Sequence, residues 1–444
     1  MAQEPPGLTR RLARFITGTS EADLPGYVYE HAKVALLDWY AVAIAGKDDP
    51  LVLKLIRVAD LMGGSEQATL IGHGLRKSAC QAALVNGAAS HALDYDDTLV
   101  PFLGHPSVTI FPSLLALAEW KKKSGEDLLT SYLIGLKVGA VLGAYSGLSH
   151  YMAGWHGTST MGHLASAAAC ARLLRLSEQE TVHALGIAAT QASGLKRVFG
   201  TMCKPFHAGR ASQAGLLAVL LAAEGFDAPE DTLEGPQGFF DVLKGDRGEQ
   251  VLDTLGKTWE IENLSQKYHA SCHFTHSPIE AALKVAREEN LSPAQIRAIR
   301  VRTSQTALSA AHQTEAKTGL AAKFCIPYCV ANALITGRTG IQAFSEEWVG
   351  SPQIQSFMKK VTVGPDGGKA GLGAIVEVET TEGKLCTSFS DILQEVVPLE
   401  TKREKIRAKF YDLCLPVLGP TRTTAVREAI LSLDRFEDMQ PLFQ

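Results

Sequence analysis

The sequence predicts a mainly α-helical protein, in which a large all-helical domain carries a smaller, inserted α+β lid domain. Apolar residues recur at helical spacing through the first 225 residues, whereas after about residue 265 short segments alternate as strands do. From Glu400 the helical spacing returns. We therefore expect residues 1–265 and 400–444 to form the helical domain and residues 266–399 to form the α+β lid.

The first 225 residues are expected to be almost wholly helical. The segment from Val28 to Ala45 has apolar residues three and four positions apart and is followed by Gly46, a residue type that commonly ends helices. Several segments are apolar on all sides and rich in alanine and glycine, which indicates helices buried within a multi-helix domain. The expected helices cover residues 28–45, 49–62, 78–94, 110–122, 126–145, 159–175, 178–192 and 205–224.

The α+β region is expected to contain four strands with helices between them. The strand-like segments are residues 297–303, 359–363, 374–379 and 384–389, with a turn at 380–383. The helical segments are residues 278–289, 319–335 and 352–358. The last forty residues contain further helical stretches, which we expect to pack against the N-terminal helices.

The composition argues against several kinds of partner. Lys+Arg 43 and Asp+Glu 47 give a net charge of -4, so there is no basic surplus for nucleic acid. The most apolar run, Gly215 to Ala223, is much shorter than the roughly 20 residues of a membrane span. The N-terminal residues lack the apolar core of a secretory signal. The 8 cysteines form no CxxC pair, so we expect reduced thiols and a cytoplasmic protein.

The sequence has no P-loop, no GxGxxG between a strand and a helix, and no GxSxG nucleophile elbow. Chemistry is instead expected where histidine, lysine and aspartate gather between helices. Four segments have this character: 91–107 (HALDYDDTLVPFLGHPS), 150–163 (HYMAGWHGTSTMGH), 194–211 (GLKRVFGTMCKPFHAGRA) and 265–278 (SQKYHASCHFTHSP). Each segment alone also fits an ordinary helix end or a solvated charged face.

In the first segment, Asp94 and Thr98 are four residues apart, so one helical turn would place them on one face. Asp97 lies beside them, and His105 follows in a Gly-His-Pro loop. Three carboxylates within four residues repel one another unless a cation or a hydrogen-bond network holds them. We therefore expect such a network around this loop.

The second and third segments supply basic groups. His156 precedes a helix for which Thr158 or Ser159 is the expected N-cap, so backbone N–H groups there could receive an anion. In the third segment the basic residues, among them Lys196, Lys204 and His207, are interleaved with apolar ones, so we expect partial burial and anionic partners.

The fourth segment raises the question of a metal. His269, Cys272, His273 and His276 have spacings that zinc could use. No second group of ligands of similar density occurs elsewhere in the sequence. We therefore expect no bound metal.

Five motifs, in order along residues 91–337, resemble those of the MmgE/PrpD superfamily. They are HALDYDDT with GHPS downstream, AGWHGTSTMGHLASAAA, SGLKRVFGTMCKPFHAGRASQAG, KYHASCHFTH and AKFCIPYCVANALITG. The superfamily includes 2-methylcitrate dehydratase, cis-aconitate decarboxylase and iminodisuccinate epimerase. The resemblance implies an all-helical domain with an α+β lid, a homodimer, no cofactor, and a small di- or tricarboxylate as substrate.

Carried over by motif, the resemblance implies a pocket that combines acidic, basic and hydroxyl groups. Its expected catalytic residues are Asp94, His105, His156, Lys204 and, as in epimerase-like members, Tyr151. Its expected substrate-binding residues are Thr98, Lys267 and Tyr328, to which the basic stretch adds Lys196 and His207. The lysines and histidines would bind the substrate carboxylates.

All the reactions of the superfamily develop charge at a carbon next to a carboxylate, which basic groups stabilise. Dehydration of a 2-methylcitrate-like hydroxy acid is our first expectation, with Val100 and Phe102 as an apolar wall for its alkyl group. The alternatives are decarboxylation of cis-aconitate, epimerisation of an iminodisuccinate-type substrate, and a non-catalytic helical binding protein.

Overall fold

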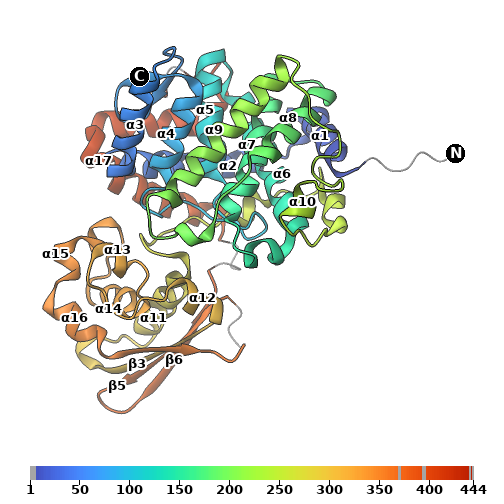
Figure 1. Cartoon of the computed structure of the whole chain (residues 1–444). Coiled ribbons are helices and arrows are strands. Elements are labelled where there is room, and N and C mark those ends of the chain that lie inside the picture. Colours follow the sequence, from blue (N-terminus) through green and yellow to red (C-terminus); the bar gives the residue numbers. More distant parts are fainter. Residues whose placement is uncertain (1–6, 369–371, 393–396, 440–441, 443–444) are drawn as a thin grey trace. The chain divides into compact units, whose positions relative to one another are not determined.

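The computed structural model describes residues 7–368, 372–392, 397–439 and 442. They belong to two compact units, unit 1 (Met1–Gln266 and Pro398–Gln444) and unit 2 (Lys267–Val397), as Figure 1 shows. The described residues are mainly helical, as the sequence predicts. The expectation of no secretory signal rests partly on the first six residues of the sequence. These six residues lie outside the described residues.

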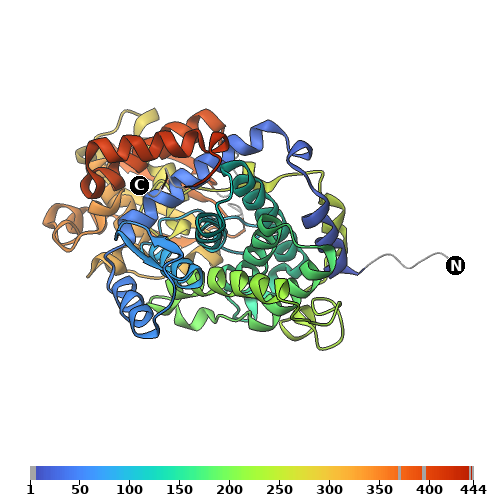
Figure 2. The same cartoon turned by 90° about the horizontal axis from the view of Figure 1, so that it is seen from above.

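Unit 1 is a multi-helix bundle (Figure 2). Its helices are α1 (Leu8–Gly18), α2 (Gly26–Gly46), α3 (Pro50–Met62), α4 (Ala79–His91), α5 (Ser107–Lys121), α6 (Gly125–Met152), α7 (Gly157–Leu174), α8 (Glu178–Gln191), α9 (Cys203–Ala223), α10 (Phe239–Val242) and α17 (Leu399–Leu431). Helix α5 contacts α2, α4, α6, α7 and α9. Most of its residues are buried, which explains why its sequence is apolar on all sides.

The small residues of the sequence allow α4 and α9 to approach each other closely. A Cβ atom at Gly87 would lie only 2.7 Å from the Cα of Gly209, and one at Gly209 only 2.1 Å from the carbonyl oxygen of Leu84. Any larger side chain at either position would force the two helices apart. This contact matters for the site, because α4 ends at His91 and α9 begins at Cys203.

Helix α6 is long and apolar enough to cross a membrane, yet 94% of its most apolar window is buried within the structure. Burial in the bundle therefore accounts for its composition. The expected helix ended at residue 145, but the chain bends at Gly147, which has a φ of 66°, and continues helically to Met152. The expectation of an almost wholly helical first half also missed the hairpin of β1 (Ala68–Leu70) and β2 (Leu75–Lys77).

Helix α17 packs against α2 within unit 1. It is bent at Gly419, which has a φ of 71°, and Pro420 follows this bend. Lys409 on α17 forms an ion pair of 2.6 Å with Asp38 on α2, and the two side chains are only 3% and 1% exposed. The ammonium of Lys409 also donates a hydrogen bond to the carbonyl of Tyr95. The C-terminal helix is thus tied to the loop that follows α4.

Unit 2 contains a four-stranded sheet with the strand order β4-β3-β5-β6. The strands are β3 (Ile296–Thr303), β4 (Val361–Pro365), β5 (Ala374–Thr380) and β6 (Leu385–Ser390), of which only β3 and β4 run parallel. Burial alternates along β5 and β6, because one face of the sheet packs against helices.

The helices of unit 2 are α11 (His276–Glu288), α12 (Gln305–Ala310), α13 (Gly319–Ala322), α14 (Ile326–Thr336), α15 (Glu346–Val349) and α16 (Pro352–Met358). Helix α11 contacts β5 and β6, and α14 contacts β4. The single helix expected over residues 319–335 is two helices, α13 and α14. Pro327 at the start of α14 fits the first turn of a new helix but not the interior of a longer one.

Candidate functional site

The loop between α4 and α5 carries the first group of expected site residues. Asp94 has a positive φ of 52°, a left-handed conformation that aspartate adopts more readily than most non-glycine residues. Helix α4 ends at His91, so Asp94 and Thr98 lie in the loop. The expectation that a helical turn places them on one face is therefore wrong.

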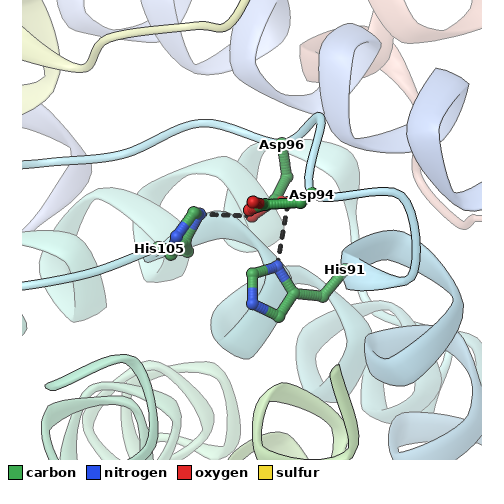
Figure 3. Close-up of side chains that lie close together, drawn as sticks. All are labelled: His91, Asp94, Asp96 and His105. Atoms are coloured by element: carbon green, nitrogen blue, oxygen red, sulfur yellow. Dashed lines mark hydrogen bonds and ion pairs between the residues drawn. The ribbon is translucent and has the colours of Figure 1, made fainter. Parts of the chain in front are cut away.

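Four side chains of this segment form a cluster, which we call the histidine–aspartate cluster: His91, Asp94, Asp96 and His105. One donor atom of each lies within 4.8 Å of those of the others. The two histidines point toward the two carboxylates in Figure 3. Nδ1 of His91 lies 2.9 Å from Oδ1 of Asp96, and Nδ1 of His105 lies 2.8 Å from Oδ2 of the same carboxylate.

The cluster has an accessible part and a buried part. The side chains of Asp94 and His105 are 17% and 13% exposed, and Lys204, whose Nζ lies 2.9 Å from Oδ1 of Asp94, is 14% exposed. His91 and Asp96 are 0% and 1% exposed. A bound molecule could therefore touch Asp94, Lys204 and His105, whereas His91 and Asp96 support them from behind.

The charge of Asp96 is held by its histidine neighbours. Burial by itself would raise the pKa of Asp96, but the interactions with His91 and His105 hold this pKa well below its ordinary value. Asp96 is therefore ionised at neutral pH. The sequence predicted a network around three neighbouring carboxylates. For two of them, the network consists of the ion pair between Lys204 and Asp94 and of the contacts of His91 and His105 with Asp96.

Asp97 lies in different surroundings from Asp94 and Asp96. The backbone N–H of Ser107 donates to its Oδ1 at 3.3 Å, and the Ser107 hydroxyl, which also contacts Tyr132, is hydrogen-bonded to its Oδ2. Burial raises the pKa of Asp97 to about 8, with smaller contributions from Asp38 and Asp96. Asp97 is thus mostly a neutral acid at pH 7, in contrast to its neighbour.

The loops before α5 and α7 pack closely against each other. A Cβ atom at Gly104 would lie 2.5 Å from the backbone nitrogen of Thr158, and the backbone N–H of His105 donates to the Thr158 hydroxyl at 3.1 Å. Helix α7 begins at Gly157 with His156 as its N-cap, so the expectation of an N-cap at Thr158 or Ser159 is wrong. The carbonyl of His156 instead accepts the N–H of Ser159 at 2.8 Å.

Two further histidines meet beside the cluster. Nδ1 of His156 lies 3.0 Å from Nδ1 of His207, which shares the first turns of α9 with Lys204. The rings of His91 and His156 stack with centroids 6.4 Å apart. Burial, followed by the charge of Lys204, holds the pKa of His156 well below its ordinary value, and burial also lowers that of His207. Both rings are therefore neutral at pH 7, so one donates the hydrogen bond that the other accepts.

Tyr151 and Lys196 contact each other. Nζ of Lys196 lies 3.7 Å from the centroid of the Tyr151 ring and donates to the Tyr151 carbonyl at 3.0 Å. Strand-like pairing joins their segments, because the N–H of His156 donates to Gly194 and that of Lys196 donates to Gly154. This pairing brings Tyr151, Lys196 and His156 into one region of unit 1.

The remaining expected residues are divided between the two units. Thr98 exchanges backbone hydrogen bonds with Ser265, both 2.9 Å long, in unit 1. Lys267 and Tyr328 belong to unit 2 and are 1% and 0% exposed. The Tyr328 hydroxyl donates to the carbonyl of Ala343. Unit 1 thus brings together Asp94, His105, His156, Lys204 and His207, and these residues form the candidate site.

The histidine–aspartate cluster also has the donor atoms of a cation site. Two imidazoles and two carboxylates are ligands that zinc accepts. One cation is already present, because the Lys204 ammonium lies beside Asp94. In the segment considered earlier for zinc, Nδ1 of His269 instead contacts the Thr339 hydroxyl at 2.7 Å, and its Nε2 lies 3.2 Å from Glu280.

Sequence reasoning missed His91 and Asp96 as members of the site. His91 opens the HALDYDDT motif and Asp96 is the middle carboxylate of DYDD, so both stood within the segment already singled out. The sequence could not separate Asp96 from Asp97, because their difference lies in the side chains that surround them.

Comparison with known proteins gives two matching family models, which together cover most of the chain. The MmgE/PrpD N-terminal domain matches residues 10–251, and the MmgE/PrpD C-terminal domain matches residues 269–435.

Curated relatives include two kinds of lyase. A cis-aconitate decarboxylase of Aspergillus terreus is 28% identical over 473 residues, which cover 99% of this chain and 95% of the relative. The cis-aconitate decarboxylase of Homo sapiens is 25% identical, with 98% of this chain and 93% of the relative covered. The mitochondrial 2-methylcitrate dehydratase of Yarrowia lipolytica is 24% identical over 75% of this chain and 67% of its own length.

Proposed function

Because the chain belongs to the MmgE/PrpD family, we propose that it is a lyase for a small di- or tricarboxylate and that its reaction is the decarboxylation of cis-aconitate. The observation that carries this proposal is the extent of the match. Cis-aconitate decarboxylases align with 98–99% of the chain, and the dehydratase of Yarrowia lipolytica aligns with 75% of it.

The arrangement of groups in unit 1 suits this chemistry. When a carboxylate leaves as CO2, its bonding electron pair stays on the carbon, and that carbon then takes up a proton. Lys204 provides a fixed positive charge for a remaining carboxylate. His105 and His156 are histidines, a residue type that commonly transfers protons in enzymes. We assign the proton transfer to His105 because it is the more exposed of the two.

Dehydration of a 2-methylcitrate-like hydroxy acid is the second candidate. It is supported by the dehydratase relatives, which align with part of the chain. The wall expected for the alkyl group of this substrate is only partly accessible, however. Phe102 was expected to form an apolar wall for the substrate's alkyl group, but it is 0% exposed and packs against Gly139 of α6. Val100 alone, half exposed, stays open to such a group.

We also propose, from the family resemblance, that the protein is a homodimer and needs no cofactor. From its composition we propose that it is cytoplasmic and has no nucleic-acid or membrane partner. Light scattering at micromolar concentration tests the dimer.

The alternative of a non-catalytic binding protein would require the polar residues of the candidate site to lie on separate surfaces. The clustering of Asp94, His105, His156 and Lys204 argues against it.

The test is incubation of the purified protein in D2O with cis-aconitate and, separately, with 2-methylcitrate, followed by proton NMR and CO2 detection. We expect CO2 from cis-aconitate and one deuterium in the product. Loss of water from 2-methylcitrate without CO2 release would favour the dehydratase. A third incubation, with an iminodisuccinate-type substrate, tests the epimerase, which would give deuterated substrate of both hands without net chemical change. No turnover of any of the three substrates would favour a binding protein.

A further inference from the structure

Asp96 is the buried carboxylate of the candidate site, and no substrate role is assigned to it. It differs from Asp94 in that it contacts two imidazoles and is almost completely buried. Its surroundings leave it little freedom, because each carboxylate oxygen faces the Nδ1 atom of a different histidine. Such a group acts on a reaction through its neighbours.

The contact fixes the tautomer of His105. Oδ2 of the ionised Asp96 lies 2.8 Å from Nδ1 of His105, and a lone pair on Nδ1 would be repelled at this distance, so we infer that Nδ1 carries the ring proton. In the neutral ring the lone pair then lies on Nε2. His105 is thereby prepared to take up or return a proton through Nε2.

His91 fixes the carboxylate in turn. Its Nδ1 contacts the second oxygen of Asp96 at 2.9 Å, and the ring centroids of His91 and His105 are 4.5 Å apart. With Oδ1 hydrogen-bonded to His91 and Oδ2 in an ion-pair contact with His105, Asp96 cannot rotate away from His105 without losing buried contacts of its charge. The close contact of α4 with α9 further restricts His91, the last residue of α4.

We propose that Asp96 is the positioning residue of this site, holding His105 with Nδ1 protonated so that Nε2 transfers the proton, and that His91 holds Asp96 in this arrangement. The inference rests on the proposed function for its catalytic part. Its structural part, the tautomer of His105, can be tested whatever the substrate is.

The structural test is nitrogen NMR of protein labelled with ¹⁵N-histidine. The chain has 13 histidines, and the His105 signals are assigned as those that disappear in His105→Gln. Protonated and unprotonated ring nitrogens have different chemical shifts, so the spectrum reports which nitrogen carries the proton. We expect Nδ1–H for His105 in the wild type and a changed tautomer population in Asp96→Asn. The Nε2–H form in the wild type would overturn the proposal.

The functional test compares the same substitution at two neighbouring buried residues. Asp96→Asn is expected to lower kcat by about a hundredfold or more, with little change in KM, because Asp96 supports the base and does not touch substrate. Asp97→Asn is the matched control. It removes a carboxyl that is neutral at pH 7, and the amide oxygen can still accept the hydrogen bond from the N–H of Ser107. Its kcat should stay within about threefold of wild type.

The outcomes separate the two proposals. If cis-aconitate is not a substrate but the wild-type spectrum shows Nδ1–H, the reaction assignment fails while the positioning of His105 by Asp96 stands. Equal losses of kcat in both variants would mean that any change in this loop disturbs the site, and would overturn the special role of Asp96. Wild-type kcat in folded Asp96→Asn would overturn it as well.

Discussion

Nζ of Lys204 lies 2.9 Å from Oδ1 of Asp94, although 110 residues separate the two in sequence. The pair joins the first turn of α9 to the loop after α4. It also compensates the negative charge of Asp94 beside the ionised Asp96. A lysine in this position can exchange its contact with Asp94 for one with a substrate carboxylate.

Lys204→Ala is therefore expected to lower kcat/KM for the substrate by more than about a hundredfold, because a charged hydrogen-bond partner of the carboxylate is lost. Both members of the pair keep some contact with water, so the melting temperature should change little. Lys121→Ala, which removes an exposed lysine lying over the Trp120 ring, is the control and should keep full activity. Wild-type kcat/KM in folded Lys204→Ala would contradict the assignment.

Activity is expected to survive exhaustive treatment with a chelator, because the Lys204 ammonium already supplies a cation at the histidine–aspartate cluster. The measurement is kcat before and after treatment, with metal content determined by mass spectrometry. One equivalent of zinc, together with activity that disappears on its removal and returns with it, would refute this prediction. His91→Gln would then show whether the metal is held by the cluster.

The stability of the protein should depend on pH through Asp97. Its pKa is raised to about 8 in the folded protein from an ordinary value of 3.8, so the folded state holds a proton that the unfolded chain has lost between these values. The stabilisation is complete below about pH 4 and is lost as the pH rises toward 8. Asp97→Asn cannot lose this proton. Its melting temperature, relative to wild type, should rise from pH 5 to pH 8, and a difference independent of pH would contradict the raised pKa.

The ion pair of Lys409 and Asp38 is buried, so removing one partner leaves an uncompensated charge. Lys409→Met is expected to reduce the free energy of unfolding by about 3–5 kcal/mol. The double variant Asp38→Asn/Lys409→Met should lose less unfolding free energy than the two single variants lose in sum, since no buried charge then remains without its partner. Urea unfolding followed by tryptophan fluorescence measures all three, and additive losses would show that the two side chains are not coupled.

The sequence by itself determined the helical character of the chain and the segments in which the site lies. Helical and strand periodicities are local properties, so most expected helices of unit 1 and the four strands of unit 2 occur within a few residues of their expected limits. The same local information misplaced Asp94 on a helix, because nothing in the adjacent residues signalled that α4 ends at His91.

Only the tertiary structure decided what each polar residue of the motif does. Asp96 and Asp97 are adjacent and chemically identical, yet one is ionised between two histidines and the other is a neutral acid beside Ser107. Their difference comes from burial and from His105, Ser107 and Tyr132, which fold back onto the loop from positions later in the chain. The state of a buried carboxyl depends on the charges and donors that surround it, and those neighbours are set by packing between distant segments.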